Sequence, residues 1–339
     1  SKDRDMIRFG EDESHIETVV EKNGISYQID MHLKKNSPKG IAINKMPIRK
    51  ASELFGIVNL VFFSPEDLNI IKNGPAERRR FIDLELSQLD KVYLNNLSNY
   101  NRIVNQRNRL LKELSFGGKK ELSDTLEIWE MQMVQYGERL IARRKEFVAQ
   151  INEIIAKIHQ KLTGGKESLQ IIYEPSTGDL PFEQALKRYR DRDLRMKSTT
   201  VGPHRDDIGF LTGDMDIRRY GSQGQQRTAA LSLKLSEIEL VRLATHDTPI
   251  LLLDDVLSEL DKHRQNYLLD SIHDIQTLIT CTGVEDLEWV QKKYSMNTAQ
   301  MKFRYWKVLR QSANVLVCTL EVHLPEVCIT LYTRLSIMP

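Results

Sequence analysis

The sequence has little of what would mark a secreted, zinc-binding or membrane protein. Its 339 residues include three cysteines, and Cys281, Cys318 and Cys328 lack the spacing of metal-ligand pairs. This argues against a disulfide framework or a cysteine zinc site and fits a reducing compartment. No apolar run approaches the length of a membrane span. We therefore expect a cytoplasmic protein with no membrane partner.

The sequence also lacks a large net charge and a phosphate-binding loop. The formal net charge is +2, so any contact with nucleic acid must come from local basic patches. The pattern G-x-x-x-x-G-K-[ST], whose backbone cradles phosphates, does not occur, and Gly164-Gly165-Lys166-Glu167 lacks the upstream glycine and the Ser/Thr. The chain starts at Ser1 without a methionine. We expect the segment that would carry this loop to precede the given sequence.

What the sequence does contain is a polar, glycine-bearing segment ahead of a predicted helix. The segment reads Tyr220-Gly221-Ser222-Gln223-Gly224-Gln225-Gln226-Arg227. A helix is predicted over 228–243, because Leu231, Leu235, Ile238 and Val241 recur at helical spacing. The first N–H groups of a helix have no internal partner and carry partial positive charge, so this segment is a candidate phosphate clamp. Glycines 221 and 224 would let backbone approach a ligand closely.

An acidic pair follows the next predicted strand. The run 250–253 is apolar and bounded by turn signals, which favours a strand buried on both faces. It ends in Asp254 and Asp255, at the strand end where ligands of open α/β sheets bind. Asp254 is a candidate Mg²⁺ ligand, and Asp255 a candidate for polarising a water that attacks a γ-phosphate. Asp261 closes a turn just beyond.

The rest of the chain divides into a β-rich opening and a helical middle. Alternation over 16–20 and 25–33 around a Lys-Asn-Gly turn, with a further short strand at 41–43, predicts a β-meander. Two apolar stripes, from Tyr93 to Leu114 and from Trp129 to Ile158, flank a Gly-Gly break and predict an antiparallel helical hairpin. Pro75 suits the first turn of a helix.

Two basic windows are candidate DNA contacts. Arg78, Arg79 and Arg80 are consecutive and cannot share one helical face, so at least one of them should pack or pair inward. The window 187–197 is the most basic of the chain. Solvated helix faces explain both windows equally well or slightly better. The DNA-binding candidates are Arg78, Arg79, Arg188, Arg190 and Arg192. His204 stands near two aspartates without a second His or Cys, so metal ligation there is not expected.

Taken together, these motifs resemble the RecF family, bacterial DNA replication and repair ATPases related to the heads of SMC proteins. The resemblance covers about residues 1–286 and rests on four motifs: Pro65-Glu66-Asp67-Leu68 with Arg78-Arg79-Arg80-Phe81-Ile82-Asp83, Gly202-Pro203-His204-Arg205-Asp206-Asp207, Gly221 to Arg227, and Leu252 to Asp261. It implies an α/β ABC-ATPase head of SMC type, with a mixed-sheet lobe and an inserted helical lobe. Asn44-Lys45 stands where the family usually has Asn-Gly, and the histidine that often follows the next strand is absent at Cys281-Thr282-Gly283.

The resemblance also implies a function and a site. ATP and Mg²⁺ would be held between two subunits, with Ser222, Gln223, Gly224, Gln225 and Asp261 at the ATP, Asp254 at the metal and Asp255 in catalysis. The partners implied are gapped or single-stranded DNA, an ATP-dependent second copy, RecO and RecR, and indirectly the RecA recombinase. Recombinational repair, replication-fork maintenance and the SOS response would be its setting.

The expected lobes are 1–83 (ATPase lobe, first part), 84–197 (helical lobe), 198–291 (ATPase lobe, second part) and an atypical tail at 292–339, which shows no periodicity that fits the family's ending. Two other functions stay open. Because the P-loop is absent, the chain could be an ATPase-dead fragment that binds DNA or a partner. An ABC transporter subunit is the third reading, and the long helical hairpin and Arg78-Arg79-Arg80 speak against it.

Overall fold

The computed structural model describes residues 3–22, 24–115, 121–281, 301–310 and 313–322. The chain forms two compact units. We call Ser1–Ser64 with Thr248–Pro339 the sheet unit, and Pro65–Asp247 the helical unit. Within the described residues, no helix has both the length and the apolar character needed to cross a bilayer.

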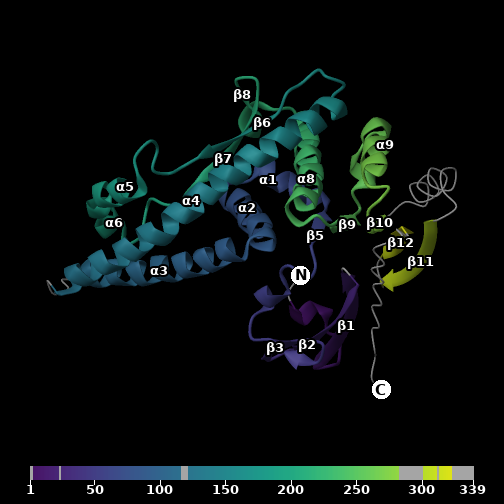
Figure 1. Ribbon diagram of the computed structural model, residues 1–339, viewed down its shortest axis with the longest axis horizontal. Coiled ribbons are helices and arrows are strands. Elements are labelled where there is room, and N and C mark those ends of the chain that lie inside the picture. Colours follow the sequence, from purple (N-terminus) through teal and green to yellow (C-terminus); the bar gives the residue numbers. More distant parts are fainter. Residues whose placement is uncertain (1–2, 23, 116–120, 282–300, 311–312, 323–339) are drawn as a thin grey trace. The chain divides into compact units, whose positions relative to one another are not determined.

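The sheet unit begins with a short 3₁₀ helix, η1 (Asp3–Met6), and an antiparallel sheet of order β1-β2-β3-β4 (Figure 1). Its strands are β1 (Glu13–Lys22), β2 (Ile25–Lys34), β3 (Ser37–Ile43) and β4 (Met46–Pro47). One face buries Val20, Leu33 and Ile41. The predicted β-meander is therefore confirmed. Asn44 and Lys45 both have positive φ, 50° and 65°, as the two-residue turn between β3 and β4 requires.

A second sheet of the same unit has the order β11-β12-β10-β9-β5. The strands β5 (Leu60–Phe63), β9 (Ile250–Asp254) and β10 (Thr277–Cys281) run parallel, whereas β12 (Ala313–Val322) pairs antiparallel with β10 and with β11 (Met301–Arg310). The tail thus supplies two strands that the sequence did not reveal, while 282–300 lie outside the described residues. The remaining elements of this unit are η2 (Ala51–Leu54), η4 (Leu257–Glu259) and α9 (Lys262–Ser271).

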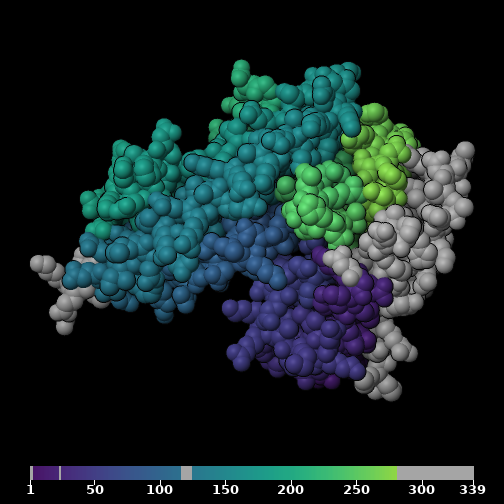
Figure 2. Space-filling model, in the orientation of Figure 1, coloured from purple at the N-terminus to yellow at the C-terminus, as the bar shows by residue number. Residues whose placement is uncertain are grey.

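The helical unit is built on a long helical hairpin. Helices α3 (Lys91–Ser115) and α4 (Glu121–Leu162) run side by side, and their surfaces are continuous in the space-filling view (Figures 1 and 2). Buried side chains of both predicted stripes, among them Tyr100, Leu111, Met133 and Phe147, belong to the core of the unit. The hairpin prediction is confirmed, although its Gly-Gly break at 116–120 lies outside the described residues.

Shorter elements complete this unit. They are η3 (Pro65–Asp67), α1 (Leu68–Lys72), α2 (Pro75–Leu89), β6 (Gln170–Glu174), α5 (Phe182–Arg188), α6 (Arg190–Met196), β7 (Asp207–Thr212), β8 (Met215–Asp216), α7 (Ile217–Tyr220) and α8 (Gln223–Thr245). Strands β6, β7 and β8 form an antiparallel sheet. Pro75 begins α2, as predicted. Helix α8 begins at Gln223, five residues before the predicted start at 228, because Ser222 provides its N-cap.

Candidate nucleotide-binding half-sites

Each unit carries one group of candidate nucleotide-binding residues. In the helical unit, Ser222 forms a reciprocal capping box with Gln225 at the start of α8. Ser222 Oγ accepts a hydrogen bond from Gln225 N at 3.2 Å, and Ser222 N donates to Gln225 Oε1 at 2.9 Å. Capping uses one acceptor lone pair of the hydroxyl and leaves its O–H able to donate. The exposed start of α8 therefore offers a hydroxyl donor together with the N–H groups of the first turn.

The two glycines of this segment have different roles. A Cβ on Gly221 would lie 2.6 Å from the Ile217 carbonyl oxygen, so glycine is needed there for packing within the chain. At Gly224 a Cβ would meet only Ser222 Oγ, at 3.9 Å. Packing within the chain is sufficient to explain Gly221, while the open space around Gly224 is compatible with close approach of a ligand.

Polar contacts from Gln225 and Gln226 fix the first turn of α8 to the rest of the helical unit. Gln226 Nε2 donates to the Ile217 carbonyl at 2.9 Å, and Gln225 Nε2 donates to Glu167 Oε1 at 3.1 Å. The predicted apolar positions Leu231, Leu235, Ile238 and Val241 of α8 are all buried. A buried helix with a fixed first turn suits a rigid binding element.

In the sheet unit, Asp254 ends β9 and is exposed, and Asp255 follows it, partly buried. Thr280 Oγ1, on the neighbouring strand β10, donates to Asp254 Oδ1 at 2.5 Å and also accepts from Asp255 N at 3.2 Å. Asp255 has a φ of +53°, in the left-handed region that costs a non-glycine residue about 1–2 kcal/mol. Aspartate and asparagine adopt this region more readily than other non-glycine residues, so the chain accommodates Asp255 directly after β9.

Asp261 forms the N-cap of α9, where it accepts from Arg264 N at 3.0 Å. This backbone hydrogen bond lowers the pKa of Asp261, and the Arg264 guanidinium, which also pairs with its carboxylate, adds to the effect. The side chain is exposed and ionised at neutral pH. Its position at the end of the loop after β9 is the one the sequence predicted.

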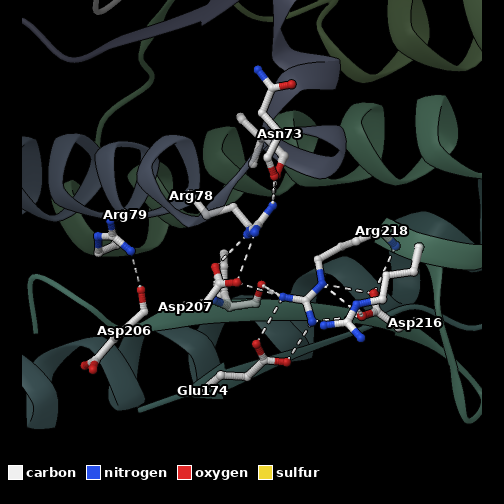
Figure 3. Close-up of polar contacts among 11 residues, drawn as sticks. Asn73, Arg78, Arg79, Glu174, Asp206, Asp207, Asp216 and Arg218 are labelled. Atoms are coloured by element: carbon white, nitrogen blue, oxygen red, sulfur yellow. Dashed lines mark hydrogen bonds and ion pairs between the residues drawn. The ribbon is translucent and has the colours of Figure 1, made fainter. Parts of the chain in front are cut away.

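Two of the arginines predicted to contact DNA, Arg78 and Arg79, are engaged by acceptors of the helical unit (Figure 3). Arg78 is only 4% exposed and forms two hydrogen bonds with Asp207, at 2.6 and 3.0 Å. Arg218 contacts the same carboxylate at 3.0 Å and also pairs with Glu174 and Asp216. The expectation that one of the three arginines pairs inward is confirmed. Arg78 is not available to DNA, because its guanidinium is buried between Asp207 and carbonyls of the chain.

The other basic candidates separate into partnered and exposed groups. Arg79 is half-buried and donates to the Asp206 carbonyl at 2.8 Å. Arg190 pairs with Glu130 and Glu127 of α4, and its hydrogen bond to Glu130 raises its pKa. Arg188 and Arg192 are exposed, with the Arg192 guanidinium 5.9 Å from the centre of the Tyr189 ring. Only these last two keep the accessibility that a phosphate contact needs.

His204 is partly buried, and both of its ring nitrogens have partners within the helical unit. Its ring nitrogens lie 2.8 Å from Tyr100 Oη and 3.2 Å from the Thr199 carbonyl. Burial lowers the pKa of His204 to about 4, so it is neutral at pH 7. Gly202 is required beside it, because a Cβ there would lie 2.5 Å from Tyr100 Oη.

Sequence reasoning missed Thr280 and Arg218. Thr280 is one of the two threonines of β10, and nothing in its neighbours along the chain indicates that it contacts Asp254. Arg218 precedes the clamp by four residues, and its three carboxylate partners come from β6, β7 and β8. The order of the motifs gave no signal for either, since both contacts depend on strand pairing.

Comparison with known proteins gives the family. No protein-family model matches the chain. The DNA replication and repair protein RecF of Agathobacter rectalis is 63% identical over 297 residues, 88% of this chain and 81% of the relative. RecF of Clostridium perfringens is 41% identical over 292 residues, 85% and 80% of the two chains.

Solved structures agree with these relatives. A structure of the recombination mediator protein RecF-ATPrS in the RecFOR pathway matches with a TM-score of 0.78 and 37% identity, covering 84% of this chain and 79% of that one. The corresponding RecF-ATP structure has a TM-score of 0.75, with 82% and 76% covered. The two units accordingly have the α/β fold of an ABC-type ATPase head, and the chain belongs to the RecF family of DNA replication and repair proteins.

Proposed function

We propose that this protein is a RecF-type ATPase that binds DNA, with the start of α8 and the end of β9 acting as half-sites for ATP across a pair of subunits. The observation that carries the proposal is the pair of exposed half-sites, each with a preformed geometry and neither covered within its own unit. The solved relatives named with ATP support the nucleotide.

Each residue has a role that its contacts permit. Ser222 O–H and the first-turn N–H groups of Gln223 and Gly224 are donors for a γ-phosphate, while Gln225 holds the cap. Asp254, exposed and oriented by Thr280, provides carboxylate oxygen of the kind Mg²⁺ prefers, and the bound ion would offset phosphate charge. Asp255 would orient and deprotonate the attacking water. Asp261 would contribute from the loop beyond β9.

The alternative is a chain that binds DNA or a partner without ATP chemistry. It is favoured by the absence of the G-x-x-x-x-G-K-[ST] pattern from the sequence. Without that loop the chain has fewer backbone donors for the β-phosphate, and its affinity for ATP should be correspondingly weak.

One set of measurements separates these two functions. Binding of labelled ATP and turnover are measured with Mg²⁺ for the full chain and for Asp255→Asn, with Asp214→Asn, at an exposed turn, as the control. Asparagine tolerates the left-handed φ of residue 255, so the variant removes charge without changing the backbone. We expect unchanged ATP binding and a turnover lowered by about 10²–10⁴-fold, as for loss of a general base. Wild-type turnover in Asp255→Asn would refute its role, and no Mg²⁺-dependent ATP binding by the wild type would favour the alternative.

The helical half is tested by Gly224→Ala. The added methyl group has room within the chain, and alanine favours the helix, so the variant should fold at least as stably as the wild type. If a phosphate approaches the backbone at this point, turnover should fall by about tenfold or more, the cost of one weakened hydrogen bond. Unchanged turnover would remove Gly224 from the proposal.

For DNA binding, we propose phosphate contacts by Arg188 and Arg192, the two exposed arginines among the candidates. Double charge reversal at these positions should weaken binding to gapped DNA and flatten its salt dependence, because phosphate contacts release counterions. Arg190→Glu is not a suitable variant, since it would break the pairs with α4. An unchanged salt slope would exclude this window. The RecFOR pathway named for the solved relatives supports RecO and RecR as partners. RecA loading is proposed as the downstream step.

A further inference from the structure

The outer face of strands β1 and β2 gathers side chains that ligate divalent metals. Alternation places Glu13, His15 and Glu17 of β1 on the same face as Asp30 and His32 of β2. The opposite face carries Val20 and Leu33, which are buried in the sheet unit. The ligand-bearing face is therefore the outer one, and its side chains are exposed or half-buried.

Strand register brings these groups together. His15 lies directly opposite His32, and Glu17 directly opposite Asp30, in the antiparallel pair. Directly opposed and diagonal side chains on one face of such a pair are within reach of one another. As a result, ligand atoms of His15, Glu17 and Asp30 all lie within 4.8 Å of one another.

These separations are close to those of a coordinated ion. Two ligands about 2.0–2.1 Å from zinc, at a tetrahedral angle, lie about 3.4 Å apart. His15 Nε2 and Asp30 Oδ1 are 3.3 Å apart, so this pair already has the required spacing. A Glu17 carboxylate oxygen lies within 4.8 Å of both atoms, and its flexible side chain must move closer to reach the same spacing.

The neighbouring groups favour this set of three. Gln28 Nε2 donates to Glu17 Oε1 at 3.0 Å, which orients the carboxylate and leaves its second oxygen for an ion. Glu13 is held by Lys34 Nζ at 3.2 Å and by His32 Nε2 at 3.1 Å, which keeps both Glu13 and His32 in a separate pair. The two carboxylates supply negative charge that a divalent cation balances.

We propose that His15, Glu17 and Asp30 bind one divalent transition-metal ion, with zinc as the best match to one nitrogen and two carboxylate ligands, and that water fills the fourth position. This site is independent of the ATP half-sites. By joining β1 to β2, the ion would stabilise the hairpin at the start of the chain.

Zinc chloride alone is the probe. Calorimetric titration of the full chain should show one zinc ion per chain, and His15→Asn and Asp30→Asn should each weaken binding at least tenfold. The matched controls are Glu21→Gln, further along the same face of β1, and His273→Asn, an exposed histidine elsewhere in the sheet unit. Both controls should bind as the wild type does. Circular dichroism confirms that each variant is folded.

Cobalt(II) substitution provides a second measurement that does not depend on the variants. Nitrogen and oxygen ligands give visible d–d bands without the intense near-ultraviolet band of a thiolate bound to cobalt. Absence of saturable zinc binding, unchanged affinity in both His15→Asn and Asp30→Asn, or a thiolate band that assigns the metal to cysteine would each overturn the proposal.

Discussion

Two pairs of consecutive aspartates show how differently the fold treats the same sequence. Asp206-Asp207 enters β7 in the helical unit, and Asp254-Asp255 ends β9 in the sheet unit. Asp206 is buried, where Tyr173 Oη and Ser176 N donate to its carboxylate. Asp207 is held between Arg78 and Arg218. The first pair is thus neutralised by hydrogen bonds and cations of its own unit.

The second pair has a different environment. Thr280 donates to the exposed Asp254, and among the described contacts of the Asp254 carboxylate none is an ion pair with a basic side chain. Asp255, directly after β9, has a positive φ of 53°. The comparison teaches that a carboxylate compensated by arginine, such as Asp207, acts in folding, while an exposed strand-end carboxylate such as Asp254 is accessible to a metal or ligand.

From this comparison we expect substitution of Asp207 to lower the free energy of unfolding most. Asp207→Asn leaves Arg78 buried with too little compensating charge, and breaking a buried ion pair costs about 3–5 kcal/mol. Chemical denaturation followed by circular dichroism measures this loss. Arg218→Gln, which leaves the Arg78–Asp207 pair intact, should cost less. A loss under about 1 kcal/mol in Asp207→Asn would contradict the structural role assigned to the first pair.

A second effect, of intermediate size, is in the pH dependence of stability. His204 lies two residues before Asp206, and its folded pKa of about 4 is below the unfolded value of about 6.5. The unfolded chain therefore binds a proton first, and stability is lost as pH falls from about 6.5 to about 4, by about 3 kcal/mol. His204→Gln should flatten the free energy of unfolding over that range. An equally steep dependence in the variant would show that other groups cause it.

The smallest expected effect is at Asp254. Asp254→Asn removes an exposed charge that has no cationic partner in the described structure, so stability should change by no more than about 0.5 kcal/mol. The same denaturation measurement checks it, directly beside Asp207→Asn. If Asp254→Asn destabilised the fold as much as Asp207→Asn does, the distinction between the two aspartate pairs would not hold.

Much of the fold could be predicted from the sequence alone. Local patterns gave the β-meander, the helical hairpin, the buried strand 250–253 and the helix after Ser222, because periodicity and capping depend on neighbouring residues. The order of motifs along the chain gave the family. The predicted start of α8, at 228, is five residues later than the observed start. Glycine and glutamine at 223–226 form no apolar helical pattern, and the capping box of Ser222 and Gln225 is visible only in the structure. The strands β11 and β12 were missed for lack of periodicity.

The order of the motifs along the chain was sufficient to predict the fold and the family of this protein, a RecF-type head. Only the tertiary structure decided which charged residues are available for function. Arg78 and Arg79 are neighbours in a basic run, yet one is buried against Asp207 and the other is half-exposed. Whether a charged side chain is compensated depends on partners from distant segments of the chain. Asp207, the partner of Arg78, is 129 residues away in the sequence, and the residues next to Arg78 do not reveal it.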